Sequence, residues 1–157
     1  MNLKRLLKTQ LPQLPKWIPI ALFVVALIGF GDATFLTVEH YRNSIPPCAI
    51  GGCETVLTSV YSETLGVPHS LVGAIYYFIV AVLIFLFLDS EKEKFLRLAL
   101  ILTPIGLLAS VFFVSIMLFV LKAFCLYCSV SALTSTLLFV GAIVIFKRSL
   151  QNEPHNP

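Results

Sequence analysis

The four cysteines of the chain form two closely spaced pairs, and this spacing is suited to thiol–disulfide chemistry. Cys125 and Cys128 enclose two residues, so at the start of a helix their sulfurs would lie about one turn apart, close enough to bridge. The N–H groups and the dipole at a helix N-terminus stabilise a thiolate, and Lys122 adds positive charge nearby. This pattern favours a redox-active pair. A static disulfide, half of a zinc site and two small apolar residues in a helix end remain alternatives for this motif.

The second pair, Cys48 and Cys53, encloses four residues that include Gly51 and Gly52, so the backbone can turn sharply enough to join the sulfurs. A disulfide that closes so small a loop restricts the unfolded chain little, which favours exchange over stapling. Two such pairs indicate a relay, in which the loop pair exchanges with a soluble protein and the other pair exchanges with a molecule in the bilayer. Zinc or another soft metal is the chemical rival, although an oxidising compartment favours disulfides.

The composition indicates that lipid surrounds the elements that position these cysteines. Of the 157 residues, 58% are hydrophobic and only 12% are charged, whereas a soluble domain carries about 25% charged residues. The net charge of +3 is small, and we expect no nucleic-acid partner. The sequence predicts an all-α integral membrane protein, a four-transmembrane-helix bundle. The four uninterrupted apolar runs cover residues 17–38, 68–88, 98–121 and 125–146.

The distribution of lysine and arginine predicts the orientation in the membrane. Nine of the eleven basic residues flank one side of the predicted spans, and Arg42 and Lys122 lie on the other. Because basic residues stay cytoplasmic, we expect both termini inside the cell and all four cysteines on the extracytoplasmic side of the cell inner (plasma) membrane. The first apolar run is too long for a cleaved signal peptide, so we expect it to be retained. The expected organisation is a basic cytoplasmic segment 1–16, a membrane domain 17–146 with an outer loop 39–67, and a cytoplasmic tail 147–157.

The outer loop contains one further apolar pattern. Between Cys53 and Ser62, the side chains of Val56, Leu57 and Val60 fall on one helical face. We therefore expect a short interfacial helix that covers the mouth of the bundle.

Three segments together resemble the vitamin K epoxide reductase family over about residues 20–146. They are residues 47–59, 66–73 and 124–128. The likeness combines four spans, a cysteine pair in the first outer loop, a serine (Ser59) six residues past Cys53, and a C-x-x-C motif that opens the last span.

The resemblance implies a bundle that holds a quinone, a ubiquinone or a menaquinone, near the C-x-x-C motif. Microbial members oxidise soluble thioredoxin-like proteins and so drive disulfide formation. A fused thioredoxin-like domain is common in them, whereas this chain stops eleven residues after Phe146, so we expect a separate thioredoxin-like partner. The implied catalytic residues are Cys48, Cys53, Cys125 and Cys128, with no metal. The implied quinone-binding residues are Ser59, His69, Phe124 and Cys128.

Two departures from the vertebrate members narrow the implied activity. Those members carry an asparagine where His69 aligns and a tyrosine where Ala132 aligns, and both polar groups face the vitamin K head group. The departures argue against epoxide reduction. His69 itself has the chemistry to bond a quinone oxygen or to supply its proton, while an interfacial histidine without chemistry is the alternative.

The last polar group of note is Asp32, which is the only acid within an apolar run. A carboxylate in a bilayer is costly unless it is protonated or partnered, so we expect a proton-relay role or pairing toward Lys122 or backbone donors. The sequence thus predicts a thiol:quinone oxidoreductase. A soft-metal carrier and a non-catalytic membrane scaffold with two static disulfides are its rivals.

Overall fold

The computed structural model describes residues 15–46, 52–59, 61–64 and 66–151. Among these residues, four helical segments are long and apolar enough to cross a membrane. The prediction of an all-α, four-helix membrane protein is confirmed. The segments are α2 (Trp17–Tyr41), α4 (His69–Ser90), α5 (Glu93–Ser115) with the π-helix η1 (Ile116–Val120) that continues it, and α6 (Leu126–Gln151).

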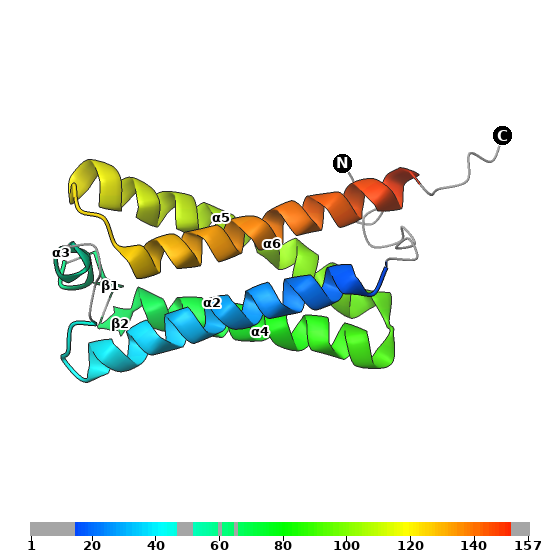
Figure 1. Ribbon diagram of the computed structural model, residues 1–157, viewed down its shortest axis with the longest axis horizontal. Helices are drawn as coiled ribbons and strands as arrows, with labels where there is room; N and C mark the ends of the chain where they lie inside the picture. Colours follow the sequence, from blue (N-terminus) through cyan, green and yellow to red (C-terminus); the bar gives the residue numbers. More distant parts are fainter. Residues whose placement is uncertain (1–14, 47–51, 60, 65, 152–157) are drawn as a thin grey trace.

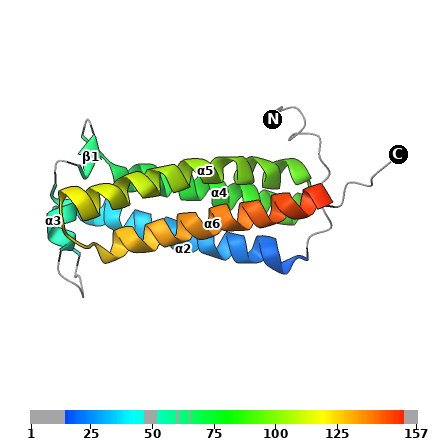
Figure 2. The same ribbon diagram turned by 90° about the horizontal axis from the view of Figure 1, so that it is seen from above.

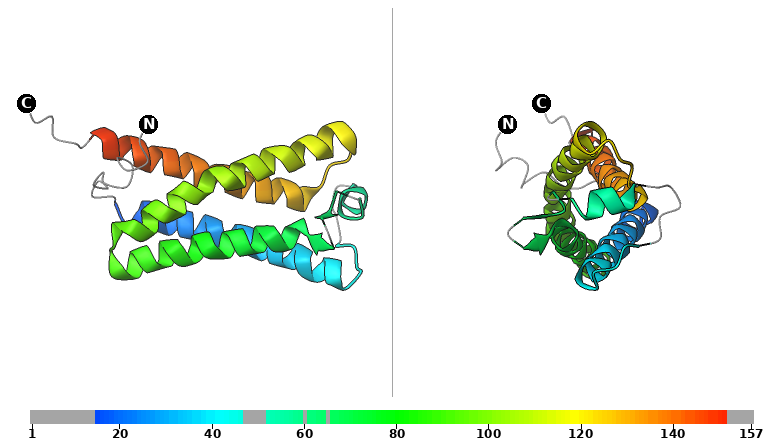
Figure 3. Two further views of the ribbon diagram at one scale, coloured as in Figure 1. Left: turned by 180° about the vertical axis from the view of Figure 1, so that it is seen from behind. Right: turned by 90° about the vertical axis from the view of Figure 1, so that its left-hand side faces the viewer.

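The four helices form an elongated bundle (Figures 1 and 2). Helix α2 packs against α4 and α6, and α5 packs against the same two helices. The described residues between α2 and α4 gather at one end of the bundle, opposite the start of α2 and the end of α6 (Figure 1). Viewed along the axis, α3 (Cys53–Leu57) lies across that end (Figure 3, right). It therefore covers the bundle as the expected interfacial helix would.

Small residues bring the helices close together in the bundle. A Cβ on Gly29 would collide with the Tyr77 ring, and one on Gly141 would collide with Leu22. Such close approach is typical of packing in membranes, where contact between helices replaces the hydrophobic effect. Large apolar side chains such as Phe78 and Leu108 remain exposed on the outside of the bundle, as lipid-facing residues do.

Two segments differ from the sequence prediction. Helix α5 begins at Glu93, five residues before the predicted third span. The connection between the second and third predicted spans, residues 89–97, is therefore reduced to Glu91 and Lys92. The helix can include charged residues because Arg97 pairs with Glu93 one turn away, at 3.7 Å, and long charged side chains at a span end can reach the aqueous boundary.

The interfacial helix is also shorter than expected. Helix α3 ends at Leu57, and the Thr58 hydroxyl bonds back to the Glu54 carbonyl oxygen at 2.8 Å. A short antiparallel pair follows, which the sequence did not indicate: β1 (Glu63–Thr64) and β2 (Val67–Pro68). Cys48, Val60 and the two ends, residues 1–14 and 152–157, lie outside the described residues.

Candidate functional site

Cys53 and Cys125, from the two predicted cysteine pairs, meet in one buried cluster at the covered end of the bundle. Cys53 is the first residue of α3, and Cys125 immediately precedes α6. Both are fully buried, and they form a cluster with Met117 of η1. Cys128 packs against this cluster from the first turn of α6. The fold therefore brings the loop and the C-x-x-C motif together. Cys48, the other loop cysteine, lies outside the described residues.

Gly52 allows α3 to lie against the segment before α6. Its φ is +121°, a conformation that side chains of L-residues rarely adopt. A Cβ at this position would lie 2.9 Å from the Phe124 carbonyl oxygen and 3.0 Å from the Phe124 nitrogen. Only glycine combines this backbone angle with such close approach. Cys53 follows directly, so the position of Gly52 controls the approach of Cys53 to Cys125.

We expect Gly52→Ala to slow electron transfer between the cysteine pairs. The added methyl group pushes α3 away from Phe124, and a displacement of about 1 Å can cost on the order of a hundredfold in rate. The measurement is the rate at which the Cys125–Cys128 disulfide is reduced after the loop pair is reduced, followed by alkylation of quenched samples. Gly66→Ala is the matched control, because Gly66 also has a positive φ but a Cβ added there would meet no atom of a non-neighbouring residue within 4 Å. Equal rates in the wild type and Gly52→Ala would contradict the proposed docking role.

Hydrogen bonds hold Cys125 in a state suited to exchange. The Cys128 amide N–H donates to Cys125 Sγ at 3.4 Å, and the Cys125 N–H donates to Met117 Sδ at 3.3 Å. A hydrogen bond from the Cys128 side chain lowers the pKa of Cys125 below its ordinary value, although burial acts in the opposite direction. A thiol of lower pKa is a better leaving group in disulfide exchange. In this structure Cys53 is disulfide-bonded, whereas Cys125 and Cys128 are free thiols.

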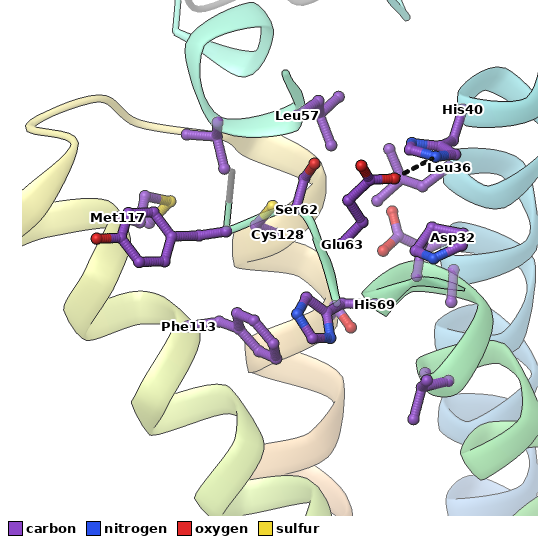
Figure 4. A pocket seen from close by; sticks show the side chains of 18 of the residues that line it. Asp32, Leu36, His40, Leu57, Ser62, Glu63, His69, Phe113, Met117 and Cys128 are labelled. Atoms are coloured by element: carbon purple, nitrogen blue, oxygen red, sulfur yellow. Dashed lines mark ion pairs between the residues drawn. The ribbon is translucent and has the colours of Figure 1, made fainter. Parts of the chain in front are cut away.

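A cavity of about 710 Å³ opens beside Cys128. This volume is in the range of small-molecule sites. Figure 4 shows Phe113 and Met117 on one side of the cavity and Asp32 and His40 on the other. Glu63, His69 and Cys128 lie between them. Apolar walls, a thiol and several hydrogen-bonding groups thus face the same cavity.

Three of the four predicted quinone-binding residues line this cavity: Ser59, His69 and Cys128. The His69 ring packs on the Phe113 ring with centroids 4.6 Å apart, and its backbone N–H donates to the Ser62 carbonyl oxygen at 3.0 Å. The Ser59 hydroxyl donates to the Val56 carbonyl oxygen at 2.8 Å.

Phe124, the fourth predicted quinone-binding residue, lies elsewhere. It is not among the residues that line the cavity, and its backbone packs against Gly52. Its ring is partly exposed. Phe124 is therefore placed to dock α3.

Two residues of the site, Met117 and Tyr76, were not predicted from the sequence. Met117 accepts a hydrogen bond from Cys125, because the π-helical turn of η1 places it in the cysteine cluster. Tyr76 lines the cavity from α4, and its hydroxyl is buried without a hydrogen-bond partner among the described residues. In the sequence, a single apolar or aromatic residue within a span looks the same whether it contributes to a site or only to helix packing. For Met117, the sequence offers only its position eight residues before Cys125, which does not by itself predict a contact.

The model of the vitamin K epoxide reductase family matches residues 20–143, which is most of the chain. No protein of curated function matches the chain.

Proposed function

The chain belongs to the vitamin K epoxide reductase family, and we propose that it is a thiol:quinone oxidoreductase that supports disulfide formation. Membership and the four apolar helices make it an integral membrane oxidoreductase. The proposed reaction takes two electrons from a soluble thioredoxin-like protein and passes them through two cysteine pairs to a quinone. The observation that carries the proposal is the burial of Cys53 and Cys125 in one cluster, with Cys128 next to it and facing the cavity.

The first proposed steps exchange disulfides at the covered end of the bundle. A reduced partner converts the Cys48–Cys53 disulfide to two thiols and becomes oxidised itself. The Cys53 thiolate then attacks Cys125 of a Cys125–Cys128 disulfide, and Cys128 leaves as the thiolate. Cys48 next attacks Cys53, which restores the loop disulfide and releases Cys125. The low pKa of Cys125 supports this last release, because an acidic thiol leaves readily.

The cavity fits a quinone head group. Phe113 and Met117 provide apolar walls, and His69 and Ser59 bring polar groups to its edge. The buried Tyr76 hydroxyl, which has no hydrogen-bond partner among the described residues, suits a ligand that carries oxygen atoms. When bound, a quinone supplies the two-electron sink that the cysteines lack. Cys128 is the thiol that faces this space, and His69 is placed to hold a proton at its ring nitrogen. Ubiquinone and menaquinone both meet these requirements.

The cavity also contains the two positions that depart from the vertebrate members. His69 and Ala132 both line it. The polar groups that face the vitamin K head group in those members are therefore replaced within the site itself. For this reason the proposal is quinone reduction and does not include epoxide reduction.

The proposal is tested with purified protein in lipid nanodiscs that contain a short-chain ubiquinone or menaquinone. Reduced thioredoxin is the probe for the thiol partner. We expect its oxidation and quinone reduction to proceed in equal amounts, followed by absorbance of the quinone and by alkylation of thioredoxin thiols. Failure of both quinones to accept electrons, with thioredoxin or with dithiothreitol as donor, would overturn the proposal.

The proposal also specifies the orientation. We expect membrane-impermeant thiol reagents to label the loop pair in intact cells after mild reduction, Cys48 first and Cys53 more slowly, because Cys53 is fully buried. The basic segment 1–16 and the tail 147–157 then lie in the cytoplasm of a cell bounded by this inner (plasma) membrane, and the loop 39–67 lies outside it. The placement of α3 at the end opposite the start of α2 and the end of α6 supports this arrangement (Figure 1). Labelling only after the membrane is broken would show that the loop cysteines face the cytoplasm and would contradict the proposed orientation.

A further inference from the structure

The inner part of the cavity holds two buried polar atoms that the cysteine chemistry leaves unused. Asp32 Oδ2 on α2 and the Tyr76 hydroxyl on α4 have no hydrogen-bond partner among the described residues. Both residues line the cavity. The expected pairing of Asp32 with Lys122 is not among the ion pairs of the described residues. Buried polar atoms are normally paired, so an unpaired acid and hydroxyl facing one space indicate a role with a ligand.

The packing of α2 on α4 places these two groups at one level. A Cβ on Gly73 would lie 3.7 Å from that of Ala33, and one on Gly29 would meet the Tyr77 ring. Asp32 adjoins Ala33 in sequence and Tyr76 adjoins Tyr77, so both lie where the antiparallel helices α2 and α4 contact each other. On α5, Gly106 has no side chain, and the Tyr76 hydroxyl occupies the space that a Cβ there would fill. The two groups form a polar part of the cavity wall on α2 and α4.

A row of cavity residues connects Asp32 with the outer end of the bundle. Asp32, Leu36 and His40 are spaced four apart on α2 and all line the cavity, so they share one helix face. His40 Nε2 lies 3.5 Å from Glu63 Oε2 of β1, at the covered end (Figure 4). The His40–Glu63 pair at the mouth and the Asp32 carboxyl group inside the cavity can together carry a proton inward.

We infer that Asp32 is a catalytic proton donor for quinone reduction, and that the His40–Glu63 pair returns its proton from the outer face. This inference rests on the proposed function and adds to it the route of one proton. Oxidation of the Cys125 and Cys128 thiols to their disulfide releases two electrons and two protons, and the quinone takes up two of each. Asp32 gives one proton from its carboxylic acid to a quinone oxygen, becomes a carboxylate, and is reprotonated by way of His40. His69 holds the second proton, and no other reactant is needed.

Several titratable groups face the same cavity and share its charge balance. They are Glu39 and His40 on α2, Tyr61 between α3 and β1, Glu63 on β1, His69, Tyr76 and Tyr77 on α4, and Cys128 on α6. Among these groups, Tyr77 is already committed, because its hydroxyl donates to the Ser131 carbonyl oxygen at 2.7 Å. Asp32 is distinguished from the acids at the mouth, Glu39 and Glu63, by its depth in the bundle and by its buried, unpaired oxygen.

The test uses the full chain in nanodiscs, with dithiothreitol as electron donor so that no protein partner is needed. We expect Asp32→Asn to slow quinone reduction by at least about a hundredfold, the usual contribution of a positioned proton donor. The loss should grow as the pH rises, because water then supplies fewer protons, and Asp32→Glu should recover part of the rate. Thr34→Val is the matched control: Thr34 has a buried hydroxyl without a partner on the same helix, but it does not line the cavity.

A second readout does not depend on turnover. Addition of quinone to the fully oxidised protein should shift an infrared carboxylic-acid band that is absent from Asp32→Asn and kept in Thr34→Val. Exchange between the loop pair and the Cys125–Cys128 pair should keep its wild-type rate in Asp32→Asn, which shows that the variant is folded. Wild-type rate and pH profile in Asp32→Asn, or an unshifted band, would overturn the inference while leaving the proposed function intact. A wild type that reduces no quinone would overturn both.

Discussion

Replacing Cys53 with alanine should abolish electron transfer from a thioredoxin-like partner to quinone, with a loss of at least about a thousandfold, as expected for removal of a nucleophile. Cys53 is the described loop cysteine that is buried with Cys125. Without it, the Cys48 thiolate attacks either the disulfide of an oxidised partner, which frees one partner thiol, or Cys125 of the Cys125–Cys128 disulfide, which frees Cys128. In both cases the loop has no second thiol to resolve the mixed disulfide. The mixed disulfide with the partner should accumulate and be visible on a non-reducing gel as a species that reduction splits into the two proteins.

Two controls separate lost chemistry from lost packing. Val56→Ala removes apolar contact with the same buried cluster but keeps all four thiols, so it should retain most of the activity. Dithiothreitol is small enough to reduce the Cys125–Cys128 disulfide directly, so it should restore quinone reduction in Cys53→Ala. Undiminished oxidation of the partner by the Cys48 and Cys53 variants would contradict the relay.

The bundle itself was predictable because a span needs only length and apolar composition. The four helices lie where the apolar runs are, and the errors occur where charged residues enter a helix, as at Arg97, which pairs with Glu93. The length of an apolar run does not show that an ion pair beside it will extend the helix by a turn.

The candidate site was predictable in part. The two cysteine pairs were found from their spacing, and family resemblance supplied Ser59 and His69, which line the cavity. The roles of Met117 and Tyr76 depend on contacts between residues distant in sequence: η1 with the start of α6, and α4 with Gly106. Phe124 adjoins Cys125 in sequence, yet its backbone packs on Gly52. Nearness in the chain therefore does not identify a cavity residue.

The second large effect concerns which thiol meets the quinone. Cys128 lines the cavity, whereas Cys125 is fully buried in the cluster with Cys53 and is not among the cavity-lining residues. In Cys125→Ala, Cys128 has lost its disulfide partner and remains next to the head group. We expect this variant to show a long-wavelength absorption band with bound quinone, because a thiolate is an electron donor and a quinone an acceptor.

The identity of the thiol can be read from a small set of variants. The band should strengthen as the pH rises, since a thiolate forms by loss of a proton. It should be absent from Cys128→Ala and from the variant that lacks both cysteines. Denaturation should remove it from Cys125→Ala, because the band requires the folded cavity. A band that persists without Cys128 but disappears when Cys125 alone is replaced would reverse the assignment. It would mean that the buried thiol reaches the quinone, so that Cys128 would have to be the residue that exchanges with the loop.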